Sequence, residues 1–484
     1  MNKRNQNLLL AGALGLAGAY VASKVVSQSS RGRAGAARNG GLVKVDLLDT
    51  AALAVDVLAP TFAKGVIVRR PKVVALAERL GLDRRAVRRM QKLHDKYGDG
   101  PLMLPLPIRK QAVVLAPEHV RRVLDESPEP FSAASSEKRA ALSHFEPKGA
   151  LISCGRERAG RRRFNEDVLE HESAVHHMVG KFLPTVDDEA GRMLAGARDK
   201  GELDWDSFNA GWTRMVRRVV FGGGAAGDHS ISDMIIKLRK AANWAFMHPK
   251  KTGMRERFLA RIQTYLDRAE PGSLAAVAAS VPQTADTAAN QQVPQWLFAF
   301  DAAGMATFRA LALLAAHPEQ AARARAELRS HPGMERQYLP FLRATVLESL
   351  RLWPTTPAIL RQTTRDTDWG GDTMPAGTGV LVFTPFFHRD DRRMACANRF
   401  APELWLKDDQ VREAQDRDWP LIPFSSGPVT CPARNLVLML TSVMLGALID
   451  EGADGKVLRL PQGRLDPARL PGTLDNYGLR FALR

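Results

Sequence analysis

One cysteine in a short loop is the residue of this sequence best suited to do chemistry. Cys431 lies in the segment Pro423 to Asn435, PFSSGPVTCPARN, with Phe424 before it and an apolar run from Leu436 after it. Gly427 can adopt backbone conformations closed to larger residues. Backbone N–H groups of the loop and of the following helix would stabilise a negative sulfur. The loop therefore predicts a thiolate that binds a metal, although a cysteine taken alone is more often inert packing.

The longest apolar run predicts a helix through the core. Residues 296–316, WLFAFDAAGMATFRALALLAA, are numerous enough to cross a membrane, but Asp301 and Arg309 argue against that. A helix that is apolar on all sides in a soluble body crosses the core. Gly304 weakens the helical ladder locally, and the Thr307 hydroxyl can bend the helix or bridge the break. The pattern predicts room for a small ligand beside Thr307, with plain packing as the alternative.

Two pairs of charged residues stand at helical spacing. Glu348 and Arg351 are three residues apart in YLPFLRATVLESLRLWP, among leucines. A buried acid–base pair has to be fully hydrogen-bonded, so we expect an architectural clamp rather than a catalytic dyad. Arg158 and Arg162, in the basic segment 155–170, share a helix face. They form either a solvated basic face or a pair of guanidinium groups that bind a carboxylate-bearing cofactor.

These residues are carried by a chain that reads as mainly helical with a few short strands. Apolar residues make up 45% of its 484 positions. Alternating patterns predict a hairpin from residues 101–107 and 111–116, and a second strand pair from residues 358–364 and 373–387 joined by a Gly-Gly turn. Three widely separated cysteines provide neither a disulfide framework nor a Cys-x-x-Cys zinc pattern, and they fit a reducing compartment.

Charge and the first residues bear on partners and location. The net charge of +17 is compatible with nucleic acid, an anionic membrane or an acidic protein. The arginine clusters are not interleaved with aromatic residues and no zinc-finger or RNA-binding motif occurs, so we expect no nucleic acid. Residues 1–41 read as a segment apart from the body at 42–484. A membrane anchor over residues 8–26, with the body in the cytoplasm, is favoured over a cleaved signal peptide or a disordered tail.

Taken together, these motifs resemble those of the cytochrome P450 superfamily, from about Leu82 to the C-terminus. The matching residues are Phe424, Gly427 and Cys431 for F-x-x-G-x-x-x-C, Glu348 and Arg351 for E-x-x-R, and Ala303, Gly304 and Thr307 for the central-helix motif. The resemblance implies a mainly α fold with small β-sheets, built as a single haem-binding domain over residues 42–484. It also implies a long central helix over the haem and a thiolate loop before a C-terminal helix.

The resemblance also assigns roles to individual residues. Cys431 would be the axial thiolate ligand of the iron of haem b, with Phe424 and Gly427 shaping its loop. The expected partners of the haem propionates are Arg158, Arg162 and Arg361. Thr307 would order water and help to deliver protons, with Asp301 as a further candidate on that proton path.

Three positions depart from the family pattern. Ala306 stands where the central helix usually carries an acid, and Val429 stands where a basic residue often contacts a propionate. Leu404 replaces the arginine that usually joins Glu348 and Arg351, and we expect Arg399 to substitute for it.

The resemblance implies a monooxygenase that inserts one oxygen atom into an apolar small molecule. Electrons would come from a separate acidic ferredoxin or flavoprotein reductase, which the basic surface suits. Ala306 motivates one alternative, a peroxide-dependent peroxygenase or hydroperoxide isomerase. The altered clamp and propionate positions motivate another, a haem-binding or sensor protein without catalysis.

Overall fold

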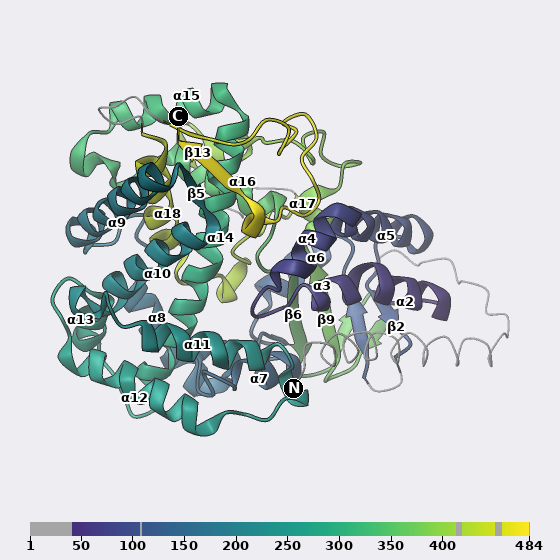
Figure 1. The fold of residues 1–484 in the computed structure, drawn as a ribbon. Helices are drawn as coiled ribbons and strands as arrows, with labels where there is room; N and C mark the ends of the chain where they lie inside the picture. Colours follow the sequence, from purple (N-terminus) through teal and green to yellow (C-terminus); the bar gives the residue numbers. More distant parts are fainter. Residues whose placement is uncertain (1–40, 107–108, 413–418, 451–456, 484) are drawn as a thin grey trace, which may run out of the picture.

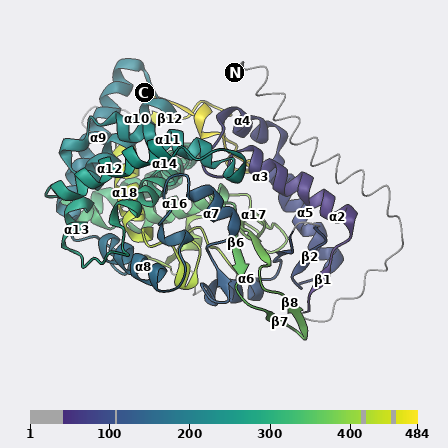
Figure 2. The ribbon, with the colours of Figure 1, turned by 90° about the horizontal axis from the view of Figure 1, so that it is seen from below.

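The computed structural model describes residues 41–106, 109–412, 419–450 and 457–483. The anchor expected over residues 8–26 lies outside these described residues. The buried apolar side chains form two clusters, a large one among the helices and a smaller one around the main sheet. Figures 1 and 2 show the corresponding arrangement, with the six-stranded sheet and the N-terminal helices on one side of the molecule and most of the helices on the other.

The larger cluster is built around the apolar helices that the sequence predicts. Helices α14 (Val293–Ala316) and α18 (Arg434–Ile449) pack against each other, and both pack against α16 (Pro340–Leu352). Helix α9 (Val179–Lys200) lies against α18 and against α10 (Trp205–Phe221), which also contacts α14. The remaining helices of this half are α7 (Ser136–Leu142), α8 (Gly155–Leu169), α11 (His229–Ala242), α12 (Thr252–Arg268), α13 (Leu274–Ser280) and α15 (Pro318–Ser330).

Helix α14 is the buried central helix of the fold. Within the described residues, one stretch, Ala289–Ala316, is long and apolar enough to cross a membrane, and 72% of its most apolar window is buried inside the protein. Arg309 is buried in this helix. Its guanidinium donates to the carbonyl oxygens of Trp353 and Leu474, at 3.2 and 3.1 Å, and these bonds offset the cost of burial. The helix therefore lies in the core, as its sequence predicts.

The main sheet has six strands in the order β1-β2-β3-β9-β6-β4. Its strands are β1 (Val43–Lys44), β2 (Leu102–Leu104), β3 (Gln111–Val113), β4 (Phe131–Ser132), β6 (Ala358–Thr363) and β9 (Gly379–Phe383). The predicted hairpin is present, since β2 and β3 are antiparallel with Leu102 opposite Val113. Strands β6 and β9 are also antiparallel, with Arg361 opposite Val380.

One connection differs from the prediction. The Gly-Gly turn joins a separate two-stranded hairpin, β7 (Thr367–Trp369) and β8 (Asp372–Met374), rather than β6 and β9. Both glycines have positive φ, which suits the tight turn. The alternating pattern in the sequence extends over β6, β8 and β9, so it does not reveal which of these strands pair.

The other elements cover the sheet or join its strands. The N-terminal helices are α2 (Leu47–Leu53), α3 (Ala59–Ala63), α4 (Pro71–Leu80) and α5 (Leu82–Tyr97). Helices α6 (Pro117–Asp125) and α17 (Thr384–Arg389) follow strands of the sheet. Three smaller strands, β12 (Leu458–Arg459), β13 (Arg480–Leu483) and β5 (Glu202–Asp204), bring the C-terminal segment against the large helical half.

Candidate functional site

The cysteine loop is held in shape by its own backbone. The Cys431 N–H donates to the Phe424 carbonyl at 2.9 Å, and the Thr430 N–H donates to the Gly427 carbonyl at 2.9 Å. Gly427 has φ +67°, and a Cβ built there would lie 2.4 Å from the Leu124 carbonyl oxygen. The position therefore requires glycine both for its conformation and for its close contact with α6. Cys431 lies three residues before the start of α18.

Burial raises the pKa of the Cys431 thiol above its ordinary value. A backbone hydrogen bond at Ala433 and the positive charges of Arg162 and Arg434 act in the opposite direction but do not cancel the effect of burial. The helix start and the loop N–H groups alone thus do not produce the thiolate expected from the sequence. A bound metal ion would supply the missing positive charge, because a coordinating thiol is deprotonated by the metal.

Arg162 connects the cysteine loop to α8. Its Nη1 donates to the Thr430 carbonyl and its Nε to the Glu166 carboxylate, both at 2.6 Å. Arg158 lies one turn earlier on α8, and burial and the charge of Arg162 lower its pKa. Arg162 is therefore bound to the cysteine loop and is not part of a solvated face, whereas the binding of a cofactor by Arg158 and Arg162 stays a prediction.

A cluster of cations lies beside the cysteine loop. Arg361 of β6 is 2% exposed, and its Nε donates to the Ser127 hydroxyl at 2.9 Å and its Nη2 to the Ser425 hydroxyl at 3.3 Å. Burial, and then the charge of Arg158, lower the pKa of Arg361 to about 10. Burial, and then the charge of Arg361, hold the pKa of Lys138 well below its ordinary value. We call Lys138, Arg158 and Arg361 the basic cluster.

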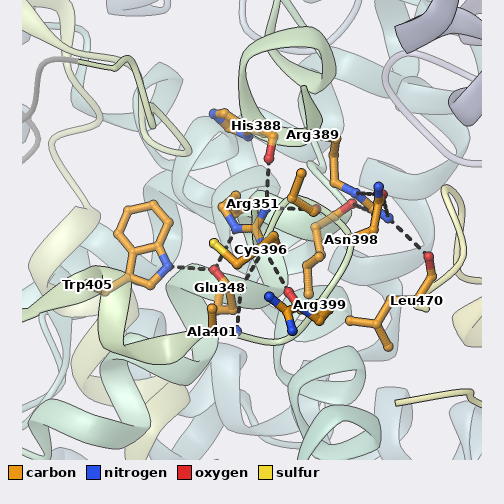
Figure 3. A network of polar contacts seen from close by, with 12 residues as sticks. Glu348, Arg351, His388, Arg389, Cys396, Asn398, Arg399, Ala401, Trp405 and Leu470 are labelled. Carbon is orange, nitrogen blue, oxygen red and sulfur yellow. Dashed lines mark hydrogen bonds and ion pairs between the residues drawn. The ribbon is translucent and has the colours of Figure 1, made fainter. Parts of the chain in front are cut away.

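Glu348 and Arg351 form the predicted clamp, shown in Figure 3. Both side chains are fully buried and they share two hydrogen bonds, at 2.6 and 2.7 Å. The carboxylate also accepts from the Ala401 N–H and from the Trp405 indole N–H, each at 2.8 Å. The guanidinium donates in addition to backbone carbonyls that include those of His388, at 2.7 Å, and Ala397, at 3.0 Å. A buried ion pair with this many hydrogen bonds serves to hold the segment between α17 and the cysteine loop.

Thr307 occupies a fully buried position on α14, and its hydroxyl donates to the Ala303 carbonyl at 2.9 Å. The helix runs through Gly304 without the interruption that the sequence suggested. A Cβ at Gly304 would lie 2.8 Å from the Trp212 ring, whose indole N–H donates to the Phe300 carbonyl at 2.8 Å. The glycine is therefore needed for the close approach of α10. The Thr307 hydroxyl is hydrogen-bonded to a backbone carbonyl one turn earlier on the same helix.

Asp301, the second residue expected on the proton path, forms an ion pair with Arg239 of α11. The Arg239 side chain is 4% exposed and lies over the Phe298 ring, 4.6 Å from its centroid. Asp301 thus links α14 to α11 and lies six residues before Thr307. Its part in proton delivery stays a prediction.

Comparison with known proteins agrees with this geometry. Residues 282–451, which contain α14, the clamp and the cysteine loop, match the cytochrome P450 family model. The fold is that of two solved structures: a cytochrome P450, CYP102L1, and the retinoic acid-bound cyanobacterial CYP120A1. Each has a TM-score of 0.64 and 18% identity, and the alignments cover 82% and 81% of this chain and 94% and 93% of those chains. Residues 282–451 of this chain therefore belong to the cytochrome P450 family, and the described chain has the cytochrome P450 fold.

Curated relatives match over about a third of this chain. A flavonoid-6-hydroxylase of Mentha piperita is 34% identical over 148 residues, 29% of each chain. A trans-cinnamate 4-monooxygenase of Oryza sativa subsp. japonica is 31% identical over 183 residues, 36% of this chain and 35% of that one. A cyclooctat-9-en-7-ol 5-monooxygenase of Streptomyces melanosporofaciens is 33% identical over 142 residues, 28% of this chain and 30% of that one. The matched region spans about a third of these relatives.

The cytochrome P450 family implies a haem cofactor, and the residues present fit one. Cys431 offers a sulfur ligand from a fixed loop. The charge of Arg361 lowers the pKa of Lys138, the charge of Arg158 lowers that of Arg361, and neither Lys138 nor Arg361 forms an ion pair with a carboxylate among the described residues. Partly desolvated cations without counter-charges favour a bound anion, and the propionates of haem are such a group.

Lys138 is a member of this cluster that the sequence did not reveal. It stands between Glu137 and Arg139 in a polar segment, which is typical of a solvated surface. In the structure its ammonium donates to the Leu360 carbonyl at 3.0 Å, next to Arg361. Val429 is 8% exposed and brings no charge to the cysteine loop, whereas the cations of the basic cluster stand on α7, α8 and β6.

The clamp is completed by a different residue from the one expected. Arg399 is exposed, and its side chain donates at 3.5 Å to the Ala395 carbonyl, away from Glu348. Only the Arg399 backbone carbonyl takes part, as an acceptor from Arg351 at 2.9 Å. The extra donor to Glu348 is the indole of Trp405, directly after Leu404. The expectation for Arg399 was wrong because an indole N–H can replace a guanidinium as a donor without bringing a second charge into the core.

Proposed function

We propose that this protein is a haem-thiolate monooxygenase that holds haem b and inserts one oxygen atom from dioxygen into an apolar small molecule. The observation that carries this proposal is the position of Cys431. Its loop is fixed by the Phe424 carbonyl and by Gly427, and it lies beside the basic cluster. When bound, a haem with an axial thiolate supplies the chemistry of oxygen activation.

The chain's own residues then have separate tasks. Lys138, Arg158 and Arg361 hold the anionic edge of the cofactor. The buried Thr307 hydroxyl holds a proton at Oγ1, donated to the Ala303 carbonyl, and its rotation would release that proton toward the site. The clamp keeps the segment before the cysteine loop in place, so that the sulfur stays at a fixed position.

An acidic ferredoxin or flavoprotein reductase fits the surface near the thiolate loop. On α8, whose Arg162 contacts that loop, Arg156 and Arg163 are exposed. Complementary charge would steer an acidic electron donor to this side and would weaken with salt. This supports a separate electron donor.

A second surface of the protein suits association with the cytoplasmic face of a membrane. Phe62, Val66, Phe246 and Met247 are 56%, 37%, 73% and 74% exposed. Their segments are adjacent, because the backbone N–H groups of Ile67 and Val68 donate to the Asn243 side chain. Exposed apolar side chains of this kind suit insertion into the membrane interface.

Spectroscopy tests the ligand assignment. We expect the reduced carbon-monoxide complex of the wild-type protein to show the long-wavelength band typical of a thiolate ligand, and Cys431→Ala to lose it. Cys154→Ala, which removes an exposed cysteine, should leave the band unchanged. A band that survives in Cys431→Ala would refute the assignment of the sulfur ligand.

The second candidate is a peroxide-dependent enzyme. Ala306 is 1% exposed and provides no acid beside Thr307, and Asp301 is bound to Arg239. Comparison of turnover with hydrogen peroxide alone and turnover with NAD(P)H and a reductase chain separates the two. Faster turnover with the reductase supports the monooxygenase, and turnover with peroxide only supports the second candidate. A spin-state change on substrate binding without product from either supply would indicate a sensor.

A further inference from the structure

A second basic site lies away from the cysteine loop. A pocket with a cavity volume of about 80 Å³, open to solvent, lies between α5, the end of α16, α17 and the loop before β13. Seven of its lining side chains are cationic and only two are carboxylates. The cations are Lys64, Arg69, Arg84, Arg88, Arg309, Arg389 and Arg469. None of the residues assigned to the haem site lines this pocket.

The two carboxylates do not neutralise these cations. Asp83 pairs with Lys64 and also accepts from the Thr473 hydroxyl. Asp391 is exposed and accepts from the Gln91 amide at 2.9 Å. Across the described residues, none of the six arginines of the pocket forms an ion pair. The pocket therefore has a large excess of positive charge.

Backbone carbonyls bind several of these arginines, which gives the cluster a structural role as well. Arg389 donates to the Leu470 carbonyl at 3.1 Å and to the Asn398 side chain, as Figure 3 shows. Arg84 donates to the Leu470 carbonyl at 3.3 Å. These bonds fasten the loop before β13, but a carbonyl dipole does not cancel a formal charge. Burial lowers the pKa of Arg389 to about 9, with the charges of Arg351 and Arg84 adding to the effect.

Arg309 at the inner wall carries an unused donor. Its side chain is 6% exposed, its two terminal nitrogens bond to Trp353, Leu474 and Asn476, and its buried Nε has no partner. Burial, the largest cause, lowers the pKa of Arg309 to about 10, and the charge of Arg69 acts in the same direction. The charges of Asp475 and Asp83 oppose this effect, but neither carboxylate forms an ion pair with Arg309 in the described residues. A desolvated guanidinium with a free N–H and no carboxylate bonded to it is a group that an anionic ligand would stabilise.

We propose that this pocket binds a multiply charged phosphate group, either of a free phosphate compound or of a lipid headgroup. Guanidinium groups from five separate segments meet there, and planar N–H forks match the oxygens of a phosphate. A bound phosphate would cross-link α5 to the loop before β13 and would stabilise the folded protein by mass action. The proposal is independent of the activity proposed above.

Titration with inorganic pyrophosphate at low ionic strength tests the pocket. We expect calorimetry on the full chain with its cofactor to show one site, and the melting temperature to rise relative to sodium chloride of equal ionic strength. The double variant Arg84→Gln/Arg469→Gln removes two cations at the mouth and should weaken binding about tenfold or more. The matched control is Arg85→Gln, an exposed neighbour on α5 outside the pocket, which should weaken binding by less than about twofold.

Vesicles distinguish the two sources of phosphate. Stronger binding to phosphatidylcholine vesicles that contain phosphatidic acid than to pure phosphatidylcholine, lost in the double variant but not in Arg85→Gln, indicates a lipid headgroup. Pyrophosphate binding without that difference indicates a free phosphate compound. The absence of both overturns the proposal. Equal weakening by the double variant and Arg85→Gln also overturns it, since the general field of the +17 chain would then suffice.

Discussion

The indole of Trp405 offers a direct measurement of how this chain completes its clamp. Trp405→Phe removes the N–H that donates to Glu348 at 2.8 Å and leaves an aromatic ring in a site that is 2% exposed. The carboxylate keeps its two bonds from Arg351 and one from the Ala401 N–H. One of four donors to a buried charge is therefore lost.

A second tryptophan provides the reference for the magnitude. Trp353 is 3% exposed, and its indole donates to a neutral acceptor, the Pro471 carbonyl, at 3.0 Å. Trp353→Phe and Trp405→Phe lose the same volume, so the packing costs largely cancel. A hydrogen bond to a neutral group contributes about 1 kcal/mol, and one to a charged group about 2 kcal/mol or more. We expect Trp405→Phe to lower the free energy of unfolding by about 1–2 kcal/mol more than Trp353→Phe does.

Equilibrium unfolding in urea, followed by far-ultraviolet circular dichroism, measures both variants. The slopes with denaturant should match that of the wild-type protein, and the midpoint of Trp405→Phe should be the lower of the two. Equal midpoints would show that the indole N–H contributes no more to the buried carboxylate than it would to a backbone carbonyl. The assignment of Trp405 as the replacement for the family's arginine would then be wrong.

Three further variants test the cysteine loop, the clamp and the basic cluster. Gly427→Ala should cost about 2 kcal/mol or more of unfolding free energy and reduce cofactor content, whereas Gly81→Ala, also at positive φ but with open space around it, should cost about 1 kcal/mol. Burial and the charge of Arg351 lower the pKa of His388 to about 3, below the ordinary value of 6.5, so the unfolded chain takes up a proton that the folded protein does not. Stability should therefore fall by about 1.4 kcal/mol per pH unit as the pH decreases from 6.5 toward 3, and His388→Gln should make this dependence weaker in urea titrations at each pH. Lys138→Met should stabilise the cofactor-free protein. It should also increase the rate of haem transfer to apomyoglobin about tenfold. An unchanged rate would show that Lys138 is no partner of the propionates.

The sequence predicted those parts of the site that depend on local spacing. The cysteine loop, the Glu348–Arg351 pair and the buried central helix are each contained in one short segment whose pattern fixes the local geometry. Strand pairing was predicted for the first hairpin but not around the Gly-Gly turn. Alternation identifies strands there, while the partner of each strand is decided by contacts between residues far apart in the chain.

The residues that the sequence did not reveal act through contacts between distant segments. Trp405 reads as packing because its polar atom is a single N–H, and Lys138 reads as solvated because its neighbours in sequence are charged. Gly304 was interpreted as a break in the helix, whereas the structure assigns it to the approach of Trp212. In each case the deciding partner is more than fifty residues away.

At two of the three departures from the family pattern a polar residue is missing, and a polar residue from another position in the chain lies nearby. Leu404 removes a cation from the clamp, and Trp405 supplies a neutral donor in its place, so the Glu348 charge is balanced by Arg351 alone. Val429 removes a basic residue from the cysteine loop, and Lys138 lies beside Arg361 at the edge of the site. Ala306 differs, because the nearest acid earlier on the helix, Asp301, is paired with Arg239. In the proposed function the cations for the cofactor thus come from other elements, while the acid that usually accompanies Thr307 has no such replacement on α14. This asymmetry makes the comparison of reductase-driven and peroxide-driven turnover the decisive experiment on the reaction.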